Sequence, residues 1–206
     1  TTRNVLRTEL NFTMGPSAAQ KAGIEGTGID VALIDTGVAP VKYMNTADAL
    51  VNGPDLSLDK QAGMAASVDG YGHGTHLAGI IAGRDAGVAP GSRIVNMTVG
   101  ASDGAVDVSQ VIAAIDWTVA HRNDPGMNIR VINLAYGTAS TQLYTSSPLT
   151  HAVESAWRNG IVVVVSAGNS AGALVNPATD PFVITVGSVD TNDPYTLADD
   201  ALAPFS

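Results

Sequence analysis

The sequence contains no cysteine and few basic residues. Each of these features excludes particular kinds of function. Without cysteine in 206 residues, disulfide bonds, cysteine-ligated zinc and thiol catalysis are excluded. Lys and Arg number 10 against 19 Asp and Glu, which gives a formal charge of −9 at pH 7. Non-specific nucleic-acid binding needs a cationic surface, and so does a basic helix that lies on a membrane. We therefore expect neither a nucleic-acid partner nor a membrane partner.

Long apolar runs are also absent. No stretch reaches the ~20 apolar residues that a transmembrane helix needs, and no signal peptide with a basic and an apolar region begins at Thr1. If the protein is exported, we expect its targeting segment to have been removed already. The chain is nevertheless 45% hydrophobic, enough for a full core. We expect a single domain over residues 1–206.

Apolar strands alternate with amphipathic helices along the chain. The run Ile29–Ile34 is typical of a strand that is covered on both faces of a parallel sheet. Residues 38–68 are predicted as a long polar loop with at most one short strand. Further strands are predicted at 93–99, 129–134, 161–165 and 182–186, the last of the chain, and helices at 17–22, 107–121 and 147–159. This alternation predicts a doubly wound α/β fold, with a mostly parallel sheet and helices on both faces.

The stretch Asp69–Gly83 reads D-G-Y-G-H-G-T-H-L-A-G-I-I-A-G and combines glycines, two histidines and an apolar run. Its aliphatic residues predict one shared helix face, formed by Leu77, Ile80 and Ile81. Asp69 is expected to cap the turn that leads into this helix. A histidine held at the start of a buried helix, with glycines that allow close approach, suits acid–base chemistry.

Polar residues follow the predicted strands at their carboxyl ends, where the ligands of open α/β sheets bind. Asp35 follows the first strand, and Asn169 follows the strand at 161–165. His73 stands at the entry to the helix between them. The three residues therefore form a candidate constellation.

Three sequence blocks resemble the subtilisin-like serine proteases (subtilases). They are V-A-L-I-D-T-G-V at 31–38, D-G-Y-G-H-G-T-H-L-A-G at 69–79 and V-V-S-A-G-N at 164–169. The resemblance implies that Asp35 orients His73, that His73 is the general base and acid, and that Asn169 donates to the oxyanion. It also implies a polypeptide substrate, bound as an added strand. The implied substrate-binding residues are Gly104, Asn133, Leu134, Ala135, Tyr136, Gly137, Ala167 and Gly168.

The sequence departs from this family at the nucleophile. The family's serine stands in a Gly-Thr-Ser-Met-Ala-like block at the start of a helix, and no such block occurs here. We therefore expect these residues to be the N-terminal two-thirds of a catalytic domain. The serine would come from a complementary C-terminal segment beyond Ser206, and this chain alone would be inactive. The family resemblance also implies secretion.

Other interpretations of the same residues stay open. A truncated module that binds peptides without cleaving them is one. An esterase is another, because Gly100–Gly104 fits the G-x-S-x-G elbow with Ser102 as nucleophile. His73 and His76 could form a metal pair, although no third ligand is evident, so no metal site is predicted. No cofactor is required, and calcium at the carbonyls of Pro181 and Val183 is left open as a structural ion.

Overall fold

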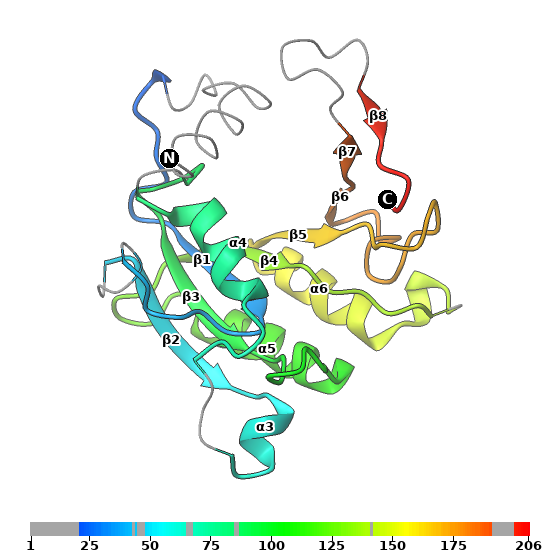
Figure 1. The fold of residues 1–206 in the computed structure, drawn as a ribbon, viewed down its shortest axis with the longest axis horizontal. Coiled ribbons are helices and arrows are strands. Elements are labelled where there is room, and N and C mark those ends of the chain that lie inside the picture. Colours follow the sequence, from blue (N-terminus) through cyan, green and yellow to red (C-terminus); the bar gives the residue numbers. More distant parts are fainter. Residues whose placement is uncertain are drawn as a thin grey trace.

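A six-stranded parallel sheet organises the molecule (Figure 1). The structure is a computed structural model that describes residues 21–42, 44, 48–64, 68–84, 87–140, 142–190 and 200–206. The sheet contains β1 (Asp30–Asp35), β2 (Leu50–Asp55), β3 (Arg93–Thr98), β4 (Ile129–Leu134), β5 (Val162–Ser166) and β6 (Ile184–Val186). Their order across the sheet is β2-β3-β1-β4-β5-β6. The predicted doubly wound α/β class is confirmed.

Strand β1 lies in the interior of the sheet, between β3 and β4, and all six of its residues are buried. Its side chains alternate between the two faces. Ala32 and Ile34 join the larger apolar cluster, whereas Val31 and Leu33 join the smaller one. The prediction of a strand covered on both faces is therefore confirmed, since alternate residues of one strand point to opposite sides.

Helices cover the two faces unequally. The α-helices are α3 (Leu58–Gln61), α4 (His73–Ala82), α5 (Val108–His121) and α6 (Pro148–Arg158), and a short 3-10 turn, η1, spans Tyr144–Ser146. Helix α4 packs in the cluster that contains Val31 and Leu33. Helices α5 and α6 contact each other and pack in the cluster on the other face, apart from α4 in Figure 1.

The buried face of α4 consists of small residues. Gly74, Ala78 and Ala82 are buried. Leu77 and Ile81 pack beside the same cluster at its margin. The predicted shared face of Leu77, Ile80 and Ile81 is thus only partly right, because α4 approaches the sheet through the small residues between them. Such close approach brings the start of α4 against the end of β1.

Two predictions about elements need correction, and a third falls mostly outside the described residues. The segment 38–68, predicted as a loop with at most one short strand, contains the helix α3 in addition to the strand β2. The strand at β6 is not the last, because β7 (Val189–Asp190) and β8 (Ala201–Leu202) follow and pair antiparallel. Two-residue strands are too short to show any periodicity in a sequence. Residues 17–20 of the predicted helix at 17–22 lie outside the described residues.

Side-chain caps mark the starts of α5 and α6. The Asp107 side chain accepts from the N–H of Ser109 at α5, and Gln110 completes a capping box. Ser147 caps α6, with Pro148 in its first turn.

Within the described ranges, no helix is both long enough and apolar enough to span a bilayer.

Candidate active site

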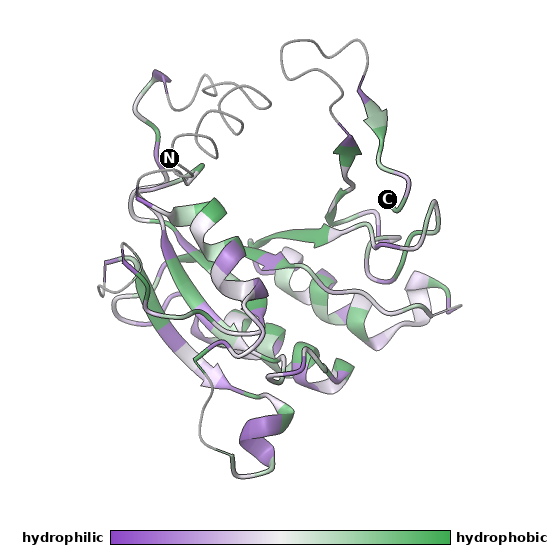
Figure 2. Cartoon of the chain, in the orientation of Figure 1, coloured by the Kyte–Doolittle hydropathy of each residue, from purple (hydrophilic) through white to green (hydrophobic). Residues whose placement is uncertain are grey.

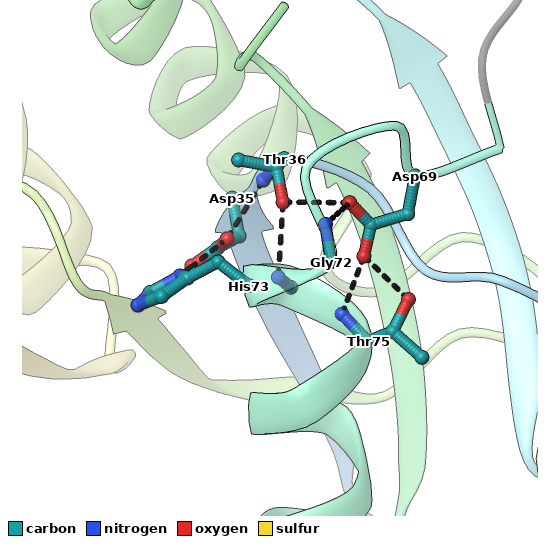
Figure 3. A network of polar contacts seen from close by, with 7 residues as sticks. Asp35, Thr36, Asp69, Gly72, His73 and Thr75 are labelled. Atoms are coloured by element: carbon teal, nitrogen blue, oxygen red, sulfur yellow. Dashed lines mark hydrogen bonds and ion pairs between the residues drawn. The ribbon is translucent and has the colours of Figure 1, made fainter. Parts of the chain in front are cut away.

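The carboxyl end of β1 meets the first turn of α4, and this contact joins Asp35 to His73. The His73 Nδ1 atom lies 2.8 Å from Asp35 Oδ1 and 3.0 Å from Oδ2. The Asp35 side chain is 3% exposed and that of His73 is 43% exposed. A buried carboxylate thus holds one ring nitrogen, while the other ring nitrogen points away from Asp35 (Figure 3). A free imidazole nitrogen next to solvent can accept or donate a proton.

Two glycines allow this close approach. A Cβ on Gly74 would collide with the carbonyl oxygen of Gly37. Gly37 itself has a φ of +113°, and a Cβ there would lie 2.5 Å from the Val68 carbonyl oxygen. Both positions therefore exclude side chains. Together they bring the backbone of α4 against the turn that follows β1.

A cavity of about 470 Å³ opens beside His73. It lies at the carboxyl ends of β1 and β4, where ligands bind in open α/β sheets. Six of the residues predicted from the sequence line it: Asp35, His73, Gly104, Ala135, Tyr136 and Asn169. Burial, and then the charge of the nearby Asp107, raise the pKa of Tyr136. Its phenol therefore stays neutral at ordinary pH.

Asn169 reaches this cavity from a different strand. It follows the end of β5, is exposed and lines the cavity with His73. The carboxyl ends of three strands, β1, β4 and β5, thus contribute to one site.

The other predicted substrate-binding residues do not line the cavity: they are Asn133, Leu134, Gly137, Ala167 and Gly168. Leu134 and Ala167 are buried. A Cβ on Gly137 or on Gly168 would meet the Val175 side chain. Val175 therefore occupies the space beside both glycines.

Several site residues were not singled out in the sequence. Tyr71 and Val106 line the cavity, and the Tyr71 ring leaves no space for a Cβ on Gly104. Thr36 lines it as well, next to Asp35. Tyr71 stands two residues before His73, so its position in the histidine block is the signal that could have identified it.

The alternative sites find little geometric support. Within the described part of the chain, no three His, Cys, Asp or Glu residues are placed to hold a metal ion, and His76 is exposed. Ser102 is exposed in a turn, and α5 begins only at Val108. A nucleophile elbow needs its helix directly after the serine, so Gly100–Gly104 does not form one.

Comparisons with known proteins point to a single family. The model of the Subtilase family matches residues 26–206. Serine protease AprX of Bacillus subtilis (strain 168) is 31% identical over 196 residues, which are 89% of this chain and 43% of AprX. Subtilisin Savinase of Lederbergia lenta is 33% identical over 186 residues, which are 85% of this chain and 61% of Savinase.

A solved structure agrees with these relatives. The crystal structure of a cold adapted subtilisin-like serine proteinase superposes with a TM-score of 0.66 at 30% identity. The match covers 88% of this chain and 59% of that one. The chain thus spans about two fifths to three fifths of the length of these three proteins.

Proposed function

The chain belongs to the subtilase family, and from this premise we propose that it is part of a serine endopeptidase with an Asp-His-Ser triad. The observation that carries the proposal is the pair of contacts between His73 Nδ1 and the buried Asp35 carboxylate. This arrangement holds one tautomer of the ring and leaves Nε2 to act as the base. The substrate is a polypeptide.

The proposed chemistry follows from the positions of three side chains. His73 takes the proton of a serine hydroxyl as that oxygen attacks the peptide carbonyl. Asp35 stabilises the imidazolium that results. Asn169, which lines the same cavity, donates its side-chain N–H to the oxyanion of the tetrahedral intermediate. His73 then returns the proton to the leaving amine.

The nucleophilic serine is proposed to lie outside residues 1–206. Of the described residues that line the cavity, none is a serine, and the sequence has no Gly-Thr-Ser-Met-Ala-like block. Ser102 does not line the cavity, and its backbone N–H donates to Asp59 Oδ2 of α3 at 2.8 Å. This chain alone is therefore expected to be inactive.

An uncovered sheet face supports a complementary segment. Val162, Ile184 and Val186 are exposed, and the parallel register of β5 and β6 places them on one face. Val163 and Val165 point to the opposite face and are buried in the cluster that contains α6. Burying an exposed aliphatic side chain stabilises by roughly 1.5–3 kcal/mol. We propose that the serine-bearing segment covers this face.

The proposal also covers cofactors, calcium, secretion and domain organisation. No cofactor takes part in the chemistry, and calcium at the carbonyls of Pro181 and Val183 stays a prediction for a structural ion. Secretion is proposed from the family. Residues 1–206 are proposed as one domain that this segment completes.

The test is hydrolysis of a chromogenic peptide anilide by the chain with and without a segment that carries the serine block. We expect hydrolysis only when both are present, and none from a His73→Ala variant. Hydrolysis by the chain alone would show that the nucleophile lies within it. Measurable peptide binding without turnover, even with both parts, would instead favour the peptide-binding module.

A further inference from the structure

The Asp69 carboxylate is the centre of a hydrogen-bond network at the start of α4 (Figure 3). Its Oδ1 atom accepts from the Gly72 N–H at 2.7 Å and from the Thr36 hydroxyl at 2.9 Å. Its Oδ2 atom accepts from the Thr75 N–H at 2.9 Å and from the Thr75 hydroxyl in a short bond. Four donors thus converge on a single carboxylate, and none of them belongs to His73 or Asp35.

Thr36 connects this carboxylate to the candidate catalytic pair. Its hydroxyl oxygen accepts from the Gly74 N–H at 3.0 Å while its proton goes to Asp69. Its own N–H donates to Asp35 Oδ1 at 2.7 Å, the same oxygen that contacts His73. Asp35 therefore contacts His73, and the next residue, Thr36, bonds to Gly74, the residue after His73.

Thr75, in the first turn of α4, makes a similar connection to the loop that follows β1. Its hydroxyl oxygen accepts from the Ala39 N–H at 2.9 Å while its proton goes to Asp69. The loop after β1 is thus joined to α4 through two threonine hydroxyls, both of which donate to Asp69. Removing the carboxylate would leave both hydroxyls without the acceptor for their protons, and each would keep only the bond that it accepts from a backbone N–H.

We propose that Asp69 is a positioning residue, which orients the hydroxyls of Thr36 and Thr75 and thereby holds His73 in register with Asp35. The inference rests on the proposed function, in which His73 is the base. Asp69 itself touches neither the ring nor the cavity. Its effect on chemistry passes through the two threonines.

An ordinary helix cap would not account for these contacts. Helix α5 has such a cap in Asp107, whose carboxylate bonds to Ser109 and, in a capping box, to Gln110, both within three residues of it. At α4 the cap position is Gly72, in a left-handed conformation and without a side chain to cap the turn. Asp69 precedes that position by three residues and also bonds to Thr36, 33 residues away in the chain.

The electrostatics of Asp69 agree with a carboxylate that stays ionised. Burial alone would raise its pKa, but the hydrogen bonds from Thr75, Gly72 and Thr36 outweigh burial and lower the pKa below its ordinary value. A carboxylate with a depressed pKa keeps its stabilising contacts above the unfolded-state value of about 3.9. The contacts are lost only as the pH falls through the lower, folded-state value. The network is therefore intact at the pH where a protease histidine works.

The direct test is NMR of the histidine side chains in Asp69→Asn, with Asp107→Asn as a matched control. Both substitutions remove one capping carboxylate and add an amide. We expect the hydrogen-bonded Nδ1 proton of His73 to be observed in the unmodified protein and in Asp107→Asn, and to be lost in Asp69→Asn. Retention of that resonance in a folded Asp69→Asn protein would overturn the proposal.

A second pair of variants covers the case in which Asp69→Asn does not fold. Thr36→Val removes the bridging hydroxyl at nearly constant volume, and Thr36→Ser keeps it. We expect the Nδ1 resonance to be lost in the valine variant and retained in the serine variant. Equal behaviour of the two variants would show that the hydroxyl bridge does not hold the ring.

Kinetics separate this inference from the proposed function. In the protein supplied with its nucleophile, we expect Asp69→Asn to lower kcat by about 10²-fold, because a misplacement of ~1 Å has an effect of that size. KM should change little, since Asp69 does not line the cavity. Loss of the resonance without peptide hydrolysis by any variant would sustain the inference and refute the function. Unchanged kcat in Asp69→Asn would refute the inference alone.

Discussion

Two regions of the same sheet differ in how completely their side chains find partners within the described residues. At the junction of β1 and α4, the polar groups around Asp35 bond to one another, and β1 is buried along its whole length. At β5 and β6, aliphatic side chains stay exposed: Ile184 is 54% exposed. Figure 2 shows hydrophobic residues along β6 and β7, at the margin of the molecule.

The comparison shows that the first region is stabilised by contacts within this chain, whereas the apolar side chains of the second region are not covered by the described residues. Hydrogen bonds within one short region can position an acid and a base without further help. Exposed apolar side chains cannot be shielded from water by local hydrogen bonds. Another element has to pack against them. In the proposal made above, the first region already positions the acid and the base, and the second is the face that the serine-bearing segment would cover.

The largest expected effect lies in the first region. Asp35→Asn keeps the shape of the side chain but favours the wrong tautomer of His73, so kcat should fall by about 10⁴-fold, the magnitude known for serine protease triads. Steady-state kinetics of the complemented protein measures it. A loss below tenfold would mean that Asp35 does not orient the base.

Asn169 should have the next largest effect, because it lies at the end of β5 and so joins the two regions. Asn169→Ala should lower kcat by about 10²–10³-fold, a magnitude established for the oxyanion asparagine of a subtilisin. KM should stay close to its original value. A change in KM alone would assign Asn169 to substrate binding and not to the oxyanion.

The same substitution, isoleucine to alanine, compares the stability contribution of the buried core with that of the exposed face of β5 and β6. Ile132 is fully buried in the cluster under α5 and α6, so Ile132→Ala should lower the free energy of unfolding by about 2–5 kcal/mol. Ile184→Ala should lower it by at most ~0.5 kcal/mol in the chain alone. With the complementary segment bound, the cost of Ile184→Ala should rise. A cost that is the same in both states would rule out this face as the docking surface.

The smallest effect concerns Asp180, a buried carboxylate before β6 that lies near Glu154 of α6. Asp180 and Glu154 are both buried. Burial, with the nearby Glu154, raises the pKa of Asp180 despite the hydrogen bond from the Phe182 N–H. Ionisation of Asp180 therefore costs more in the folded protein than in the unfolded chain.

That cost appears as the pH rises from the unfolded-state pKa to the folded-state value, and it persists above. Asp180→Asn removes it and keeps an acceptor for the Phe182 N–H. We expect urea unfolding at pH 7 to show a modest gain in stability, and unfolding at pH 3 to show none. A gain that is equal at both values would exclude ionisation as its cause.

Much of the fold could be predicted from local pattern. Strand β4 was predicted at its observed bounds, and β1, β3, β5 and α5 within one or two residues, because their periodicity and caps agree. Strand β2, with the sequence L-V-N-G-P-D, contains Gly53 and Pro54, so its sequence indicates a loop. It forms at the edge of the sheet because pairing with β3 outweighs its poor propensity.

The sequence predicts those site residues that occur within short, contiguous sequence motifs. Asp35 and His73 were named from their sequence blocks, and the structure brings them into contact. The network around Asp69 was not predicted beyond a local cap, because its bond to Thr36 joins residues 33 apart. Val175 beside Gly137 and Gly168 was likewise invisible, since only the folded chain brings these residues together.

Covalent labelling with a fluorophosphonate, followed by peptide mapping, locates the nucleophile directly. In the protein supplied with the complementary segment, we expect one labelled serine outside residues 1–206 and no labelling in the His73→Ala variant. A label on Ser102, or on any other serine of this chain, would contradict the proposal that His73 activates a serine from a segment docked beside β5 and β6.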